Sequence, residues 1–125
     1  MAEDAVLSVY VSQPLCAEAK EELDRRGGRA GGYRLRAVCV DDTGSDGIAR
    51  LAAIGGAARR ATEDSATIAY VGATDPTAIR FSKPILEEAG VSRISTNSGS
   101  ASMRRLLRAL RHGEAGVAPR ELVSR

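Results

Sequence analysis

Two short apolar runs decide the fold of this chain. Residues 5–11 read Ala-Val-Leu-Ser-Val-Tyr-Val, and residues 66–71 read Ala-Thr-Ile-Ala-Tyr-Val. Both runs are nearly continuous and rich in β-branched residues, which is typical of strands that are buried on both faces of a parallel sheet. The first run ends at Ser-Gln-Pro (12–14) and the second at Gly72. We therefore expect two central strands.

Two further strands are expected around this pair. Residues 33–40 read Tyr-Arg-Leu-Arg-Ala-Val-Cys-Val and begin with strict alternation, which places Arg34 and Arg36 on one face. That pattern favours a strand at the edge of the sheet. Residues 91–95, Val-Ser-Arg-Ile-Ser, predict a fourth, short strand.

Helical periodicity and glycine stops predict helices between the strands, at 16–26, 47–63, 77–89 and 101–112. Asp46 is expected to cap the second helix. Pro84 is expected to break or kink the third, unless a new helical segment begins there. Residues 113–125 show no periodicity and predict a disordered tail. The folded domain would then comprise residues 1–112.

Strands that alternate with helices predict a parallel sheet with right-handed crossovers. The two apolar runs belong inside it and 33–40 at an edge, so the expected order of the four strands is 2-1-3-4. This is a three-layer, flavodoxin-like α/β fold. Ligands of such sheets bind beyond the carboxyl ends of the strands. The loops to consider are therefore 12–16, 72–77 and 95–100.

Composition excludes several classes of function. A chain of 125 residues is one domain of ordinary size, and its formal charge of +2 does not indicate a nucleic-acid partner. No apolar run is long enough for a transmembrane helix, and the acidic start Met-Ala-Glu-Asp does not resemble a signal peptide. His112 is the single histidine. We see no phosphate-binding loop, nucleophile elbow or dinucleotide fingerprint, so no catalytic residue, metal or cofactor is predicted.

The two cysteines leave two interpretations. Cys39 alternates with apolar neighbours and is expected to pack as a small apolar residue. Cys16 lies near a helix start, where a thiolate is favoured. Their strands are neighbours in the expected sheet, but Cys16 follows its strand by several residues. We therefore expect two free thiols, with a disulfide as the alternative.

An ordered series of stretches points to a known family. The series comprises Val-Tyr-Val-Ser-Gln-Pro-Leu (9–15), the glycine-rich turn and strand at 27–36, Asp-Asp (41–42), Ala-Ala-Arg-Arg-Ala (57–61), Thr-Ile-Ala-Tyr-Val-Gly (67–72), Pro-Ile-Leu-Glu-Glu-Ala-Gly-Val (84–91) and Ile-Ser (94–95). In this order the chain resembles the amino-terminal lobe of the type I periplasmic-binding-protein family over about residues 5–110. Within that family it is most similar to the branched-chain amino-acid (Leu/Ile/Val) receptors of ABC transporters. The second lobe of the family is absent, so the chain resembles a truncated receptor.

The resemblance implies a function and a site. The chain would be the substrate-binding lobe of an extracytoplasmic receptor that captures a small amino acid between two lobes and presents it to an ABC permease. No nucleic acid, cofactor or membrane insertion is implied. By position, the ligand contacts would come from Thr74, Asp75, Thr77, Asn97 and Ser98. The competing interpretation is that Asp75, Thr77 and Ser98 only cap helices.

Other interpretations stay open at this point. The same sheet could carry a small hydrolase or transferase, or the chain could be a vestigial fragment that binds nothing. The acidic pair Asp41-Asp42 is compatible with a metal or phosphoacceptor site as in response-regulator receivers, although a turn is the preferred interpretation. After residue 112 only Glu-Leu-Val (121–123) weakly resembles a strand that could cover 91–95. An uncovered edge favours pairing with another chain, so a homodimer or aggregation is expected.

Overall fold

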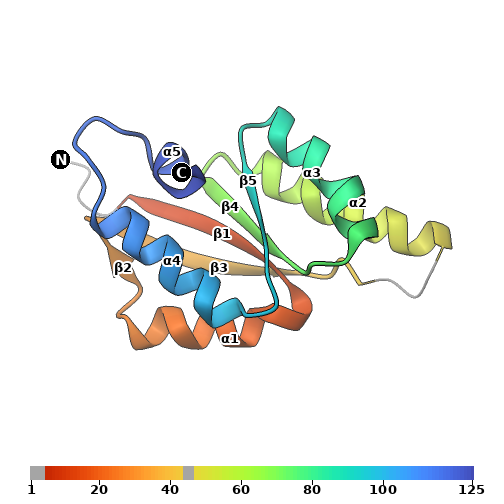
Figure 1. The fold of residues 1–125 in the computed structure, drawn as a ribbon, viewed down its shortest axis with the longest axis horizontal. Helices are drawn as coiled ribbons and strands as arrows, with labels where there is room; N and C mark the ends of the chain where they lie inside the picture. The colour runs from red at the N-terminus through yellow and green to blue at the C-terminus, as the bar shows by residue number, and fades with distance from the viewer. Residues whose placement is uncertain (1–4, 44–46) are drawn as a thin grey trace.

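The protein is an α/β sandwich of three layers (Figure 1). The computed structural model describes residues 5–43 and 47–125, so the predicted cap Asp46 lies outside the described residues. The strands are β1 (Val6–Ser12), β2 (Arg29–Ala30), β3 (Tyr33–Val40), β4 (Thr67–Gly72) and β5 (Ser92–Ser95). The helices are α1 (Gln13–Arg25), α2 (Gly47–Glu63), α3 (Pro76–Glu88), α4 (Gly99–Arg111) and α5 (Pro119–Ser124).

The sheet has the order β2-β3-β1-β4-β5. Strands β3, β1, β4 and β5 are parallel and lie in the expected relative order. The prediction of four strands with 33–40 outermost is wrong, because β2 adds an antiparallel edge strand beside β3. Glycine pairs at 27–28 and 31–32 surround β2, and all four glycines have positive φ. These left-handed turns are what allow so short a hairpin to form.

Alternation of side chains divides the core between the two faces of the sheet. Val9, Val11 and Val71 are fully buried in the cluster that also holds α1 and α4. Tyr10 and Tyr70 face the other way and pack with α2 and α3. Both central strands are therefore covered on both sides, as their apolar runs predicted.

Helix α3 continues through Pro84 without a break, contrary to the expected break or kink. Pro84 lies on the exposed side of the helix, where solvent can take the carbonyl group that its missing N–H leaves free. Leu86 of the same helix is completely buried, and Ala78 is 6% exposed. Packing on both sides of the proline holds the helix against the sheet.

The structure differs from the predicted disordered tail. Helix α5 buries Leu122 and Val123, which are 8% and 3% exposed, in the α1 and α4 side of the core. The Arg120 guanidinium donates to the backbone oxygens of Thr67 and Ala89, both at 2.8 Å. The folded domain therefore extends beyond residue 112. In the described part of the chain, no helix is long and apolar enough to cross a membrane.

The expectation of two free thiols is also wrong. Cys16 and Cys39 form a disulfide, with their Cα atoms 5.7 Å apart. Helix α1 begins at Gln13, directly after β1, and not at residue 16. Cys16 therefore lies in the first turn above the carboxyl end of β1, where β3 brings Cys39 opposite Val11. The disulfide ties α1 to β3 close to the edge where ligand loops are expected.

Candidate functional site at the carboxyl edge

The loops that follow β4 and β5 meet at the carboxyl edge of the sheet. The Thr74 hydroxyl donates to the Asn97 side-chain oxygen at 3.1 Å, across 23 positions of sequence. Both residues are exposed. Two of the predicted ligand residues are thus in direct contact, because adjacent parallel strands end side by side.

Two other predicted residues cap the helices that begin here. The Asp75 carboxylate accepts from the Thr77 N–H at 3.1 Å and caps α3. It also forms an ion pair with Arg50 of α2. The Ser98 hydroxyl accepts from the Ala101 N–H at 3.1 Å and caps α4. The capping interpretation therefore describes Asp75 and Ser98, and Thr77 contributes its backbone to a cap.

The start of α4 is held by α1. The Gly99 N–H donates to the Glu18 carboxylate at 3.1 Å. A side chain at Gly99 would collide with the backbone oxygen of Leu15, so only glycine permits this close approach. The Ser98 hydroxyl also lies 3.2 Å from the Ser100 hydroxyl. Hydroxyl groups thus gather at a fixed helix start, where the helix dipole favours negative charge.

A buried polar network below this edge was missed from the sequence. Asp42 is 7% exposed, and its carboxylate accepts from the Ser12 hydroxyl at 2.5 Å and from the Tyr70 hydroxyl at 2.6 Å. Burial raises the pKa of Tyr70, and the hydrogen bond to Asp42 raises it further. Asp41 accepts instead from the Thr43 N–H and hydroxyl. Among the described residues, no three His, Cys, Asp or Glu side chains gather as metal ligands.

Arg93 extends this network to the last strand. Its guanidinium carbon lies 5.8 Å from the centre of the Tyr70 ring. It donates to the Ser82 hydroxyl at 2.7 Å and to the Ser95 hydroxyl at 2.5 Å. One terminal nitrogen is buried without a hydrogen-bond partner. Gly72 makes this position possible, because any side chain there would collide with the guanidinium.

The sequence contains a signal for Asp42, but this signal has two interpretations. Two acids that follow a strand, as Asp41 and Asp42 do, indicate a turn as readily as a buried carboxylate. The partner of Asp42 on β4, Tyr70, is identified only once the register of three strands is known.

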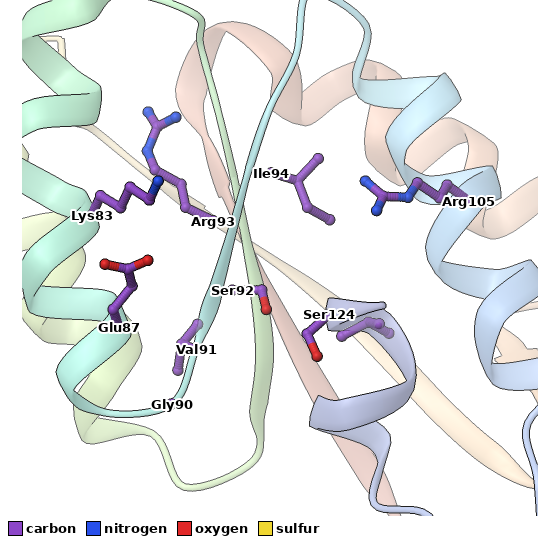
Figure 2. A pocket seen from close by; sticks show the side chains of 10 residues that line it. Lys83, Glu87, Gly90, Val91, Ser92, Arg93, Ile94, Arg105 and Ser124 are labelled. Atoms are coloured by element: carbon purple, nitrogen blue, oxygen red, sulfur yellow. The ribbon is translucent and has the colours of Figure 1, made fainter.

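One pocket lies elsewhere, along β5 (Figure 2). It has a volume of about 400 Å³, and its lining includes Arg93 but none of the five predicted ligand residues. Three smaller pockets, of about 310, 220 and 330 Å³, are also lined by other residues. The carboxyl edge offers exposed polar side chains, Thr74 and Asn97 among them.

Comparison with protein-family models, with curated proteins and with solved structures gives no match for this chain.

Proposed function

We propose that this chain is the ligand-binding lobe of a receptor for a small amino acid, branched-chain or related, with the architecture of one type I periplasmic-binding-protein lobe. The observation that carries the proposal is the contact between Thr74 and Asn97. It brings the loops after β4 and β5 together at the starts of α3 and α4. This is the part of a doubly wound sheet where ligands bind.

The groups at this edge suit a carboxylate. The hydroxyls of Thr74, Thr77 and Ser98 stand beside the first turns of two helices, whose dipoles favour an anion. The N–H groups of Thr77, Gly99 and Ala101 are already bonded within the protein, so we assign the carboxylate of the ligand to the hydroxyls. Asp75 is engaged by Arg50 and by the cap of α3. We therefore assign it to positioning α3, and assign the ammonium group of the ligand to the side-chain oxygen of Asn97.

In the proposed receptor a second lobe closes over this edge of the sheet and traps the ligand. A closed receptor would then present the amino acid to an ABC permease. The disulfide between Cys16 and Cys39 supports an extracytoplasmic location, because disulfides persist mainly in oxidising compartments.

Calorimetry with leucine, isoleucine and valine tests the proposal. Leucine has about nine heavy atoms, and the best small ligands reach about −1.5 kcal/mol per atom. If a single lobe supplies about a third of this maximum, the binding free energy is about −4 kcal/mol. That value corresponds to a millimolar dissociation constant. Thr74→Val should weaken binding several-fold, and Thr62→Val, a matched change on α2, should not.

Three results would contradict the proposal in different ways. Micromolar binding to the monomer would remove the need for a second lobe. Hydrolysis or group transfer by the purified chain would favour the enzyme interpretation. Absence of binding to any amino acid at millimolar concentrations would favour a fragment without a ligand.

A further inference from the structure

One side of β5 has no partner strand. In the described part of the chain β5 pairs with β4 alone, and it is the last strand of the sheet. The Thr96 N–H donates to the Gly72 backbone oxygen at 2.9 Å. Backbone groups of successive residues alternate between the two sides of a strand. Arg93 and Ser95 therefore turn their N–H and C=O groups outward, which is the arrangement that accepts an added strand.

This open edge forms the floor of a groove. The pocket of about 400 Å³ follows β5 from Gly90 to Ile94. Figure 2 shows Lys83 and Glu87 of α3 on one side of the strand, and Arg105 of α4 with Ser124 of α5 on the other. An extended segment laid along β5 would alternately direct its side chains toward these two walls.

The groove is lined by more cationic than anionic side chains. Lys83, Arg93 and Arg105 line it, against the single carboxylate of Glu87. None of the three cations forms an ion pair with a carboxylate among residues 5–43 and 47–125. Arg93 donates to serine hydroxyls, and Arg105 contacts the main-chain oxygen of Arg125 at 3.5 Å. The chemistry of the groove thus selects an occupant with carboxylates.

Cations stand on both walls of this groove. Lys83 and Arg93 are on the α3 side, and Arg105 is on the α4 and α5 side, where Ile94 and Val123 are almost completely buried. We infer that the β5 edge binds an extended acidic segment of another protein, whose carboxylates contact these cations.

The charge argues against a second copy of this chain at the same edge. Pairing β5 with β5 of another copy would bring three cations from each side to one seam, and like charges on adjacent strands destabilise a sheet. The homodimer expected from the sequence therefore becomes the competing outcome. The inference concerns a different surface from the Thr74 and Asn97 contact and does not depend on it.

The test uses the full chain, labelled with ¹⁵N, and a short capped peptide of alternating glutamate and valine. Bound peptide should slow hydrogen exchange at the N–H groups of Arg93 and Ser95. The peptide of alternating lysine and valine should give no protection. Lys83→Glu should weaken binding of the glutamate peptide about five-fold, because it replaces an attractive pair by a repulsive one.

Two matched variants sharpen the result. Lys20→Glu changes the other lysine of the chain, which is exposed on α1 outside the groove, and should leave binding unchanged. Glu87→Lys should tighten binding of the glutamate peptide. Equal binding of the two peptides, or no protection at Arg93 and Ser95, would overturn the inference. So would a dimer of the protein alone in which these two N–H groups are already protected.

Discussion

Asp42 is the residue at which the buried polar contacts of the carboxyl edge converge. Its two hydrogen bonds come from Ser12 at the end of β1 and from Tyr70 on β4, while Asp42 itself follows β3. Hydrogen bonds to a buried charged group contribute about 1.5–3 kcal/mol each. The network therefore joins three strands just below the loops that we propose bind the ligand.

Removing one donor should show the strength of this network. Tyr70→Phe leaves Asp42 with the Ser12 hydroxyl alone, so we expect the free energy of unfolding to fall by about 1.5–3 kcal/mol. Urea denaturation measures this. Tyr33→Phe is the matched control, because Tyr33 is only half-buried and its hydroxyl bonds to no described residue. Similar losses in both variants would contradict the role given to Asp42.

Asp64 lies at the opposite end of the strands and makes the stability of the folded protein depend on pH. Burial raises the pKa of its carboxyl, but hydrogen bonds from the Ala66 N–H, Tyr10 and Arg36 outweigh burial and lower the pKa to about 2. A carboxyl with a lowered pKa in the folded state stabilises the fold above its unfolded pKa of 3.8. That stability is lost as the pH falls from about 4 towards 2.

We therefore expect the melting temperature of the protein to fall over this pH range, and to fall less in Asp64→Asn. Asp24→Asn is a suitable control, because Asp24 is exposed on α1 and its side chain forms no ion pair with a described residue. Scanning calorimetry at a series of pH values would show the difference. Identical pH profiles for Asp64→Asn and the unmodified protein would refute this assignment.

At the scale of elements, the disulfide fixes α1 on β3. It closes a loop with a sequence separation of 23. Restricting the unfolded chain in this way stabilises a protein by about 3 kcal/mol for a loop of this length. Reduction should therefore lower the urea midpoint of the unmodified protein. The variant with both Cys16→Ala and Cys39→Ala should unfold at a low midpoint that reductant does not change. If reductant does not change the urea midpoint of the unmodified protein, the two thiols are free.

Helix α5 should behave as part of the core. Leu122→Ala removes a side chain that is 8% exposed, and we expect a loss of about 2 kcal/mol or more. Ser124→Ala, an exposed change in the same helix, should have little effect. Chemical denaturation of the two variants is the measurement. An unchanged midpoint for Leu122→Ala would show that the tail is not packed.

The same elements show which features the sequence could reveal. The runs at 5–11 and 66–71 were predicted as central strands because burial on both faces leaves a continuous apolar signature. β2 has two residues and α5 has six, which is too short for a helical or strand period to show. The disulfide can form only because α1 begins at Gln13, three positions before the start that the sequence predicted.

For the candidate site, the sequence predicted the position of some residues and missed others. Thr74 and Asn97 were expected at one edge because adjacent parallel strands end together, and their contact confirms this placement. The Asp75 ion pair with Arg50 was not foreseen, because it joins two helices whose packing no local pattern records. Asp42 and Tyr70 required the register of the sheet.

On the scale of the whole molecule, the fold separates two kinds of surface. The carboxyl edge presents hydroxyls, an amide and two helix starts, and the side of β5 presents a basic groove. We propose a different partner for each surface, a small zwitterion at the first and an extended acidic segment at the second.

The most direct test of the central claim is an NMR titration of the ¹⁵N-labelled chain with leucine. We predict saturable shifts with a millimolar dissociation constant, concentrated in the amides of residues 72–77 and 95–101. Leucinamide, which lacks the carboxylate, should cause no such shifts. Shifts located along β5 or elsewhere, or equal effects of leucine and leucinamide, would contradict the assignment of the carboxyl edge as a site for amino acids.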